Sequence, residues 1–179
     1  VLAQDEDLAL DGPRYALETL LGRGGMGEVF LCNDAVIGRK VAMKQIRDGV
    51  ELDPDARRRF LREARVQGQL EHPAIVPVYE LSTNAEGRIF FTMKRVKGES
   101  LHEILRRLRR GDAKEGDSRR RLLNAFAQVC LAVDFAHERG VLHRDLKPGN
   151  IMLGDFGEVY VLDWGLAKID DAPELDDLS

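Results

Sequence analysis

Short apolar runs separated by glycine and polar turns occupy the first half of the chain, which is the pattern of β-strands. Strands are expected at residues 15–21, 28–33, 40–47, 76–82 and 89–96, with a turn at 84–87. Asp53-Pro54 predicts a helix start, because the acid can cap the helix and proline suits its first position. That helix should end near Leu70, before His72-Pro73. The first half is therefore predicted to be a small antiparallel sheet with one inserted helix.

The second half has mainly helical periodicity. A short basic helix is expected at residues 101–110, a polar linker at 111–118 and a long helix at 119–139, which Gly140 ends. Steps of three and four residues predict the buried face of the long helix, namely Leu122, Phe126, Val129, Cys130, Val133 and His137. A hairpin follows, with strands at 151–153 and 159–162 around a turn at 154–157. The pattern as a whole predicts an α+β fold.

Composition narrows the class of protein. The 179 residues are 44% hydrophobic and 32% charged, with a formal net charge of −4. These values suit a globular chain of one domain or two small lobes and give no strong attraction to nucleic acid. No apolar run could cross a bilayer, and residues 1–11 lack the pattern of a signal peptide. Cys32 and Cys130 form no metal or redox motif, so both are expected to be reduced thiols in a cytoplasmic protein, and a disulfide between them is the less favoured alternative.

Residues 21–29 carry the first chemical motif, Leu-Gly-Arg-Gly-Gly-Met-Gly-Glu-Val, which contains G-x-G-x-x-G-x-V. Glycines let a backbone approach phosphate oxygens closely and present N–H groups to them. The motif alone is weak evidence, because a flexible β-turn can have the same composition. A dinucleotide-binding loop would need a helix directly after the glycines. A strand is expected there instead, which favours a hairpin that covers a nucleotide.

A lysine and a glutamate in the first half are candidates for a buried ion pair. In the expected strand Val41-Ala42-Met43-Lys44, Ala42 and Lys44 share one face, so the lysine lies beside a small residue that a flat base could cover. A buried lysine needs an anion, which phosphates or a helix carboxylate can supply. Glu63, in the middle of the expected helix, is the candidate carboxylate. The alternative is a surface pair between Glu63 and Arg59.

Residues 143–150, His-Arg-Asp-Leu-Lys-Pro-Gly-Asn, match H-R-D-L-x-x-x-N at every fixed position. Asp163-Trp164-Gly165 follows, and Asn150 with Asp163 would supply oxygen ligands of the kind that Mg²⁺ prefers. Asp155-Phe156-Gly157 spells the usual D-F-G metal motif more closely. It lies only five residues after Asn150, however, in a tight turn where its carboxylate would face solvent. Asp163 is therefore predicted to be the metal ligand.

Taken in order, these segments resemble the protein kinase family. Lys147, two positions after Asp145, is similar to the signature of the serine/threonine branch. The sequences Gly-Arg-Gly-Gly-Met-Gly-Glu-Val-Phe and Asp-Leu-Lys-Pro-Gly-Asn-Ile look most like bacterial, eukaryotic-like (Hanks-type) kinases. The resemblance covers about residues 15–168. It implies a complete N-lobe, made of a five-stranded antiparallel sheet and one helix, and a partial helical C-lobe that ends in the activation segment.

The resemblance also implies roles for individual residues. Lys44 would bind the α- and β-phosphates of ATP and be held by Glu63. Asp145 would accept the proton of the substrate hydroxyl, Lys147 would contact the γ-phosphate, and Asn150 and Asp163 would hold Mg²⁺. The residues expected to line the ATP site are Leu21, the glycines Gly22, Gly24 and Gly27 over the phosphates, Val29, Ala42 and Met152 around the adenine, and Met93 with Lys94 to Val96 at the back of the pocket and the hinge.

Some features depart from the family pattern or allow other interpretations. Gln67 stands one turn after Glu63, where an apolar residue is usual. It could weaken the active arrangement or bind the N–H of Trp164, which replaces the usual Phe. Arginine clusters at 57–59, 106–110 and 119–121 could suggest nucleic-acid binding, but solvated helix faces are the preferred interpretation. Arg144 resembles the arginine that meets a phosphorylated activation loop in many kinases, and a pair with a nearby acid is the alternative.

The resemblance divides the chain into a tail at 1–14, an N-lobe and hinge at 15–96, a partial C-lobe at 97–169 and an acidic, mobile start of the activation segment at 170–179. The only A-P-E tripeptide, Ala172-Pro173-Glu174, lies nine residues after Asp163 inside the acidic segment, and no peptide-docking region occurs in these 179 residues. We therefore expect a serine/threonine protein kinase whose chain binds Mg-ATP but phosphorylates protein substrates weakly or not at all by itself, and whose exposed C-lobe surface could self-associate. An ATP-binding pseudokinase or scaffold is one alternative. A small-molecule phosphotransferase is another, which the complete pattern at 143–150 disfavours.

Overall fold

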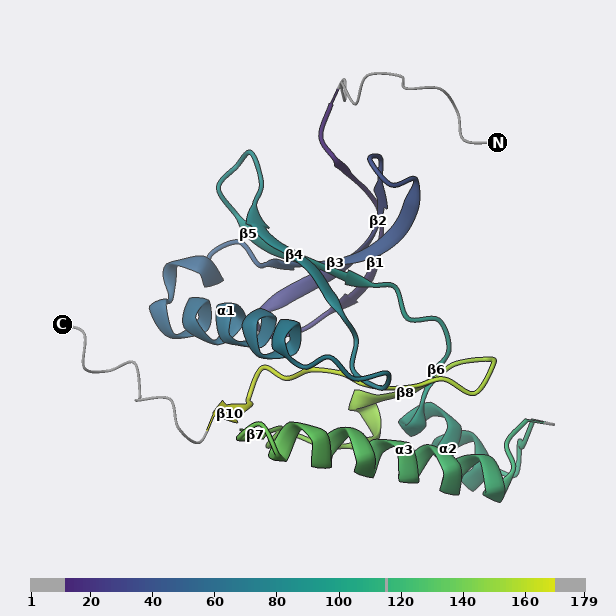
Figure 1. Cartoon of the computed structure of the whole chain (residues 1–179). Coiled ribbons are helices and arrows are strands. Elements are labelled where there is room, and N and C mark those ends of the chain that lie inside the picture. The colour runs from purple at the N-terminus through teal and green to yellow at the C-terminus, as the bar shows by residue number, and fades with distance from the viewer. Residues whose placement is uncertain (1–11, 115, 170–179) are drawn as a thin grey trace, which may run out of the picture.

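The computed structural model describes residues 12–114 and 116–169. A twisted sheet with one helix forms an upper layer, and two helices with two small sheets form a lower layer (Figure 1). The elements in chain order are β1 (Tyr15–Arg23), β2 (Gly27–Asp34), β3 (Arg39–Ile46), η1 (Val50–Leu52), α1 (Pro54–Gln69), β4 (Val78–Thr83), β5 (Ile89–Lys94), β6 (Glu99–Ser100), α2 (Leu101–Arg109), α3 (Arg119–His137), β7 (Val141–Leu142), η2 (Pro148–Asn150), β8 (Ile151–Leu153), β9 (Val159–Val161) and β10 (Lys168–Ile169).

The upper sheet has the order β1-β2-β3-β5-β4, and each neighbouring pair is antiparallel. The predicted five-stranded antiparallel sheet with one inserted helix is therefore confirmed, and the strand bounds differ from the expected ones by at most two residues. The turn expected at 84–87 joins β4 to β5, where the N–H of Gly87 donates to the carbonyl of Asn84 over 2.9 Å. The acidic segment at 170–179 and most of the N-terminal tail lie outside the described residues.

Helix α1 connects the two layers. It begins as predicted, with the Asp53 carboxylate accepting the N–H of Asp55 at 2.9 Å. Phe60 and Ala64 pack against apolar residues of the sheet. Val66 instead belongs to the apolar cluster of the lower layer. Because one helix is held by both layers, the side chains that it directs towards the sheet have a defined position.

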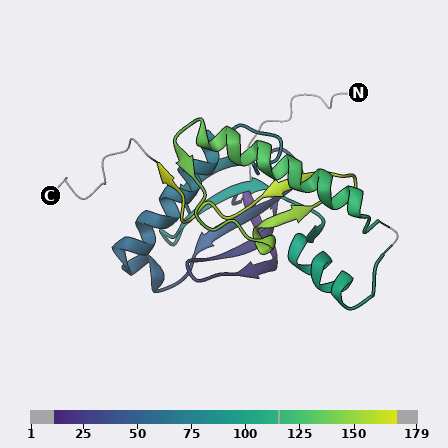
Figure 2. The same ribbon diagram turned by 90° about the horizontal axis from the view of Figure 1, so that it is seen from below.

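Helix α3 packs on the β8–β9 hairpin in the lower layer, as seen from below in Figure 2. Its buried residues are Ala125, Val129, Ala132 and Ala136. The expectation was therefore wrong for Phe126, which is 66% exposed, and for Cys130 and His137, which are also exposed. Apolar residues surround most of this helix, so more than one stripe has helical spacing. The alanine stripe faces the hairpin, where small side chains allow close packing. No helix among the described residues has both the length and the apolar character needed to cross a membrane.

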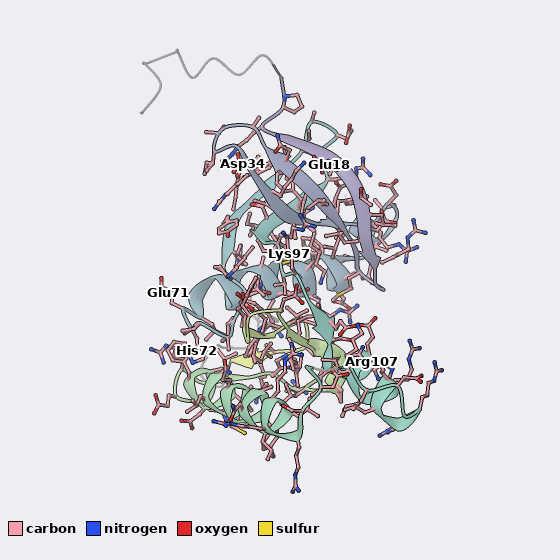
Figure 3. The ribbon with its side chains drawn as sticks, turned by 90° about the vertical axis from the view of Figure 1, so that its right-hand side faces the viewer. Glu18, Asp34, Glu71, His72, Lys97 and Arg107 are labelled. Carbon is pink, nitrogen blue, oxygen red and sulfur yellow. The ribbon has the colours of Figure 1, made fainter. Side chains whose placement is uncertain are left out.

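The connection between α2 and α3 is anchored by one arginine. Arg107 donates to both carboxylate oxygens of Glu99, at 2.8 and 3.0 Å, and to both oxygens of Asp117, at 2.9 Å each. The side chain of Asp117 is 1% exposed. Figure 3 shows Arg107 on α2, in the lower layer. The linker expected at 111–118 is thus polar, as predicted, and it is tied to the body of the protein by buried charge.

A second buried charge lies at the far end of the upper sheet. The Asp34 side chain is fully buried and accepts from Arg14 Nε at 3.1 Å and from Nη2 at 3.3 Å. The remaining Nη1 of Arg14 binds Glu80, and Tyr15 donates its hydroxyl to the same carboxylate at 2.6 Å. The hydrogen bonds from Arg14 are the largest cause of a lowered pKa of Asp34. Figure 3 shows Asp34 in the sheet, far from Arg107.

The lowered pKa of Asp34 predicts a pH effect on stability. A carboxyl with a folded-state pKa below its unfolded value near 4 stabilises the fold above that value, and the contribution is lost as pH falls through the folded pKa. Asp34→Asn should therefore be less stable than the wild type at pH 7 and differ less at pH 3. Urea denaturation at both pH values measures this. Asp155→Asn, in an exposed turn, should retain the wild-type pH dependence. Parallel pH profiles for wild type and Asp34→Asn would contradict the assignment.

Candidate functional site

An ion pair between β3 and α1 lies at the centre of the candidate site. Lys44 Nζ donates to the two carboxylate oxygens of Glu63 at 2.5 and 2.7 Å. The side chains are 14% and 3% exposed, respectively. Burial raises the pKa of Glu63, while the charge of Lys44 opposes that shift. The ammonium therefore opposes the effect of burial on the Glu63 carboxylate, and the alternative surface pair between Glu63 and Arg59 does not form.

The glycine motif forms the hairpin between β1 and β2, so a strand and not a helix follows the glycines. The N–H of Gly24 donates to the carbonyl of Gly27 at 2.8 Å. A Cβ at Gly27 would lie 2.9 Å from the backbone oxygen of Gln45, so packing inside the protein requires glycine there. A Cβ at Gly22 would meet nothing within 4 Å, and one at Gly24 would meet only an atom at 3.7 Å. The space beside these two glycines can therefore accept phosphate oxygens.

The residues expected around an adenine come from both layers. Ala42 of β3 is buried and pairs with Met93 of β5. Val29 pairs with Lys44 across β2 and β3 and is half-buried. Met152 lies in β8 of the lower layer and is also half-buried, while Leu21 in β1 is 50% exposed. These side chains include several apolar groups that a flat base could cover.

The connection between the layers starts at the end of β5. The backbone N–H of Lys94 donates to the carbonyl of Pro77 at 3.1 Å, so it is not available to a nucleotide base. The side chain of Lys94 donates to the Tyr160 hydroxyl at 2.5 Å, which links this connection to β9. Val96 lies beyond the strand and is half-buried. Figure 3 shows Lys97, the next residue, at the level between the two layers. Within the expected hinge, Lys94 to Val96, Val96 is therefore a better candidate donor than Lys94.

Three polar residues of the 143–150 segment contact one another. Lys147 Nζ donates to Asp145 Oδ2 at 2.6 Å. The side-chain amide of Asn150 donates to the Asp145 carbonyl at 2.8 Å and to Oδ2 at 3.2 Å. The hydrogen bond from Lys147 is the largest cause of a lowered pKa of Asp145. The same bond raises the pKa of Lys147, with a smaller contribution from the charge of Asp163. A carboxylate and an ammonium thus lie together at the surface, near Asp163.

Asp163 lies at the meeting point of several site elements. Its backbone has a positive φ of 61°, and the N–H of the preceding Leu162 donates to the backbone carbonyl of Asn150 at 2.8 Å. A Cβ at Gly165 would lie 3.2 Å from Asp163 Oδ1, from Glu63 Oε2 and from Met26 Cε. The loop at 163–165 therefore packs between α1 and the glycine hairpin.

The other candidate metal motif, Asp155-Phe156-Gly157, lies in the turn between β8 and β9. Asp155 is exposed in the turn between β8 and β9, and the neighbouring Phe156 is 94% exposed. The N–H of Gly154 donates to the Glu158 carbonyl at 2.8 Å, which closes a tight turn. A carboxylate at this tip faces solvent, as the spacing from Asn150 predicted.

The donor set at Asn150 and Asp163 fits a magnesium ion. The amide nitrogen of Asn150 is committed to Asp145, so its amide oxygen can face a cation. Asp163 forms no ion pair with a described residue. The described residues contain no group of three or more His, Cys, Asp or Glu side chains suited to a metal. In general, Mg²⁺ is bound by one or two protein oxygens together with phosphate oxygens and water.

His143 belongs to the motif at 143–150, but the sequence predicted no role for it. In the structure it supports the site. Its Nε2 lies 3.0 Å from the carbonyl of Leu162, and its Nδ1 accepts the N–H of Asp145 at 3.3 Å. Its ring centroid lies 4.6 Å from that of Trp164, which is fully buried. His143 therefore connects the segment at 143–150 to the loop at 163–165.

Residues 15–176 match the family model described as the protein kinase domain. The chain belongs to the protein kinase family.

Relatives of this kinase domain include bacterial proteins named serine/threonine-protein kinase PknD. The chain is 44% identical to the one from Chlamydia muridarum over 167 residues, which cover 90% of this chain and 18% of the relative. It is 43% identical to the one from Protochlamydia amoebophila over 174 residues, which cover 93% and 18%, respectively. The chain thus spans less than a fifth of the length of these relatives. They agree with the resemblance to bacterial Hanks-type kinases.

The two unusual residues of this kinase domain do not bind each other. Gln67 Nε2 donates to the carbonyl of Val76 at 2.8 Å, and Trp164 Nε1 lies 3.4 Å from the carbonyl of Val161. Gln67 therefore ties α1 to the loop before β4, and the suggested contact with Trp164 is absent. Arg144 has a positive φ of 65° and pairs with no described acid, so the alternative of a nearby acidic partner is not observed.

Proposed function

We propose that this domain transfers the γ-phosphoryl group of Mg-ATP to a serine or threonine hydroxyl of a protein. The observation that supports this best is the packing around Gly165, where Glu63 of the buried ion pair, Asp163 of the metal loop and Met26 of the glycine hairpin approach one position. Phosphoryl transfer depends on positioning and on neutralising phosphate charge more than on covalent chemistry by the protein. The packing at Gly165 joins the groups that would do this.

Each polar residue has a defined task in this proposal. Lys44, held by Glu63, neutralises charge on the α- and β-phosphates. Asp145 accepts a hydrogen bond from the substrate hydroxyl and takes its proton, while Lys147 binds the γ-phosphate. Mg²⁺ held by Asn150 and Asp163 would supply further positive charge to the phosphate oxygens. The lowered pKa of Asp145 keeps this group ionised at neutral pH, so it can orient the hydroxyl before transfer.

We further propose that the 179-residue chain by itself binds Mg-ATP but transfers phosphate weakly. The charged groups described above would serve the nucleotide, whereas no peptide-docking region occurs in the 179 residues. Transfer from γ-labelled ATP to a serine-containing peptide tests the proposal, with the chain compared to a longer protein that includes it. The longer protein should phosphorylate the peptide, and Asp145→Asn should lower its rate by about 10²-fold or more. Absence of transfer by the longer protein would support the alternative, an ATP-binding scaffold, and rapid transfer by the chain alone would refute the weak-activity proposal.

The apolar surface of α3 suggests self-association of the isolated chain. Leu123, Phe126 and Leu131 are 57%, 66% and 63% exposed, and exposed apolar patches commonly mark interfaces. We expect Phe126→Glu to shift the chain towards monomer, because a charge would have to be buried in the contact. Sedimentation velocity over a range of concentrations measures this, with Leu52→Glu, on the exposed η1 turn, as a matched control. A monomeric wild type at every concentration would exclude the proposal.

We also place this domain in the cytoplasm, where ATP is available and thiols stay reduced. Cys32 and Cys130 are both free, the first buried and the second exposed. Burial raises the pKa of the Cys32 thiol to about 11, which keeps it in the unreactive thiol form. Thiol titration of native protein should therefore detect Cys130 and not Cys32.

A further inference from the structure

A cavity of about 520 Å³ lies where the C-terminal end of α1, the loop before β4, the end of β5 and β9 meet. Figure 3 shows two of its lining residues, Glu71 and His72, where α1 approaches the lower layer. Pockets for small organic ligands commonly have about 300–1,000 Å³, mostly apolar walls and a few polar groups. The size of this cavity therefore suits a small organic molecule. Its apolar wall consists of Leu70, Pro73, Ile75, Pro77 and Val78.

The side chain of Gln67 is the first polar group of the wall, and this residue is only 3% exposed. Its amide nitrogen donates to the Val76 carbonyl at 2.8 Å and lies 3.9 Å from Sδ of Met93. Its amide oxygen accepts no hydrogen bond from a described residue, and that oxygen is not sealed from solvent. A buried amide normally has partners for both its oxygen and its nitrogen. The free oxygen is therefore suited to a ligand with an O–H or N–H donor.

The ammonium of Lys94 is the second polar group of the wall. It donates to the Tyr160 hydroxyl at 2.5 Å and forms no ion pair with a described residue. The bond to Tyr160 is the largest cause of a raised pKa of Lys94, so the ammonium stays charged at neutral pH. An ammonium has further N–H donors beyond the one that Tyr160 accepts, and these suit an anion. Glu71, the one carboxylate among the lining residues, is exposed, so water screens its charge.

We propose that this cavity binds a small organic acid that has an apolar body and a hydroxyl group. The carboxylate pairs with Lys94, the hydroxyl donates to the Gln67 amide oxygen, and the apolar body packs against the wall that contains Ile75. Gln67 stands one turn after Glu63 on α1, and Lys94 begins the connection between the two layers. The occupant therefore contacts both the helix that carries the buried ion pair and the connection at the end of β5.

Amide NMR titration of the full chain with 3-(4-hydroxyphenyl)propionate tests the proposal without any measurement of phosphoryl transfer. We expect saturable shifts at Gly68, Ile75 and Lys94, and none in the turn at 84–87. The neutral amide of the same acid should bind about fivefold more weakly, because the charge that pairs with Lys94 is lost. The acid without the hydroxyl, 3-phenylpropionate, should bind about threefold more weakly, because the Gln67 oxygen then has no donor.

Two variants assign these preferences to their residues. Lys94→Met should weaken binding of the acid about fivefold and leave binding of its amide unchanged. Lys97→Met is the matched control, because it makes the same change in a lysine that does not line the cavity, and it should keep the wild-type affinity. Gln67→Leu should abolish the preference for the hydroxylated acid. The fluorescence of Trp164, the only tryptophan and a fully buried one, verifies folding of each variant. Lys94→Gln or Gln67→Met replaces a variant that unfolds.

The absence of saturable shifts in the folded wild type at about 10 mM acid would overturn the proposal. So would equal affinity for the acid and its amide, equal affinity with and without the hydroxyl, or an equal loss in Lys97→Met and Lys94→Met. The proposed function is tested separately: loss of ATP binding with binding of the acid intact would overturn that function alone.

Discussion

Asp163→Asn is expected to lower phosphoryl transfer by roughly 10³-fold in a protein that contains this domain and to weaken Mg-dependent ATP binding. The carboxylate lies beside Glu63 in the loop that packs on the glycine hairpin, and it forms no ion pair with a described residue. Loss of a charged metal ligand removes several kcal/mol of stabilisation from developing phosphate charge, which corresponds to this rate factor. Steady-state kinetics at several Mg²⁺ concentrations measure the effect. Excess Mg²⁺ should recover part of the lost activity if the residue acts through the metal.

Asp155→Asn is the control for that prediction. It makes the same chemical change in the sequence Asp-Phe-Gly, which by spelling alone is the better metal motif. Because Asp155 is exposed at the tip of the β8–β9 turn, its loss should change neither activity nor Mg²⁺ dependence measurably. The opposite ranking of the two variants would show that the metal ligand had been assigned to the wrong aspartate.

Lys44→Met should have the second largest effect, and it should alter stability as well as catalysis. Transfer should fall by about 10²–10³-fold, because one preorganised charge on the phosphates is lost. The buried Glu63 carboxylate would also lose its partner, and breaking a buried pair from one side costs about 3–5 kcal/mol. Chemical denaturation should show a double variant, Lys44→Met/Glu63→Leu, to be more stable than Lys44→Met. It should be as inactive, because the lysine is still absent.

The pH dependence of the stability of Lys44→Met provides a further test of the buried ion pair. Burial already raises the pKa of Glu63, and without Lys44 this shift would be unopposed. A carboxyl with a raised folded-state pKa stabilises the fold at pH values below its unfolded pKa and loses that contribution as pH rises through the folded pKa. Lys44→Met should therefore become less stable, relative to the wild type, as pH increases from 5 to 8. A stability difference that does not change with pH, or that shrinks as pH rises, would contradict the buried-pair account.

Much of the upper layer was predictable because its signals are local. Alternating apolar residues indicated the strands, and Asp53-Pro54 indicated the start of α1. The Lys44–Glu63 pair was also predictable, since a buried lysine needs an anion and Glu63 stands in mid-helix. The exposed position of Asp155 was predictable from chain length, because five residues after Asn150 allow only a tight turn, while Asp163 as the metal ligand stays a prediction. In each case a short segment contains the physical constraint.

Other features depend on contacts between distant segments. Phe126 and Ala125 both fit a helical stripe, and the sequence does not state which side of α3 the hairpin covers. From the sequence, a hydrogen bond between Gln67 and Trp164 was possible. In the structure the Gln67 amide binds the Val76 carbonyl instead, and the sequence does not show where that carbonyl lies. The bond from the Lys94 N–H to Pro77 depends on how β4 approaches β5. The approach of Met26 to Gly165 likewise requires the glycine hairpin and the metal loop to be placed in space.

Isothermal titration of the 179-residue chain with ATP, with and without Mg²⁺, tests the central claim most directly. The account predicts saturable binding of one nucleotide per chain in the presence of Mg²⁺, at least tenfold weaker binding after Asp163→Asn, and unchanged binding after Asp155→Asn. Binding that is undetectable in the folded wild-type chain, or that is indifferent to both Mg²⁺ and Asp163, would contradict it.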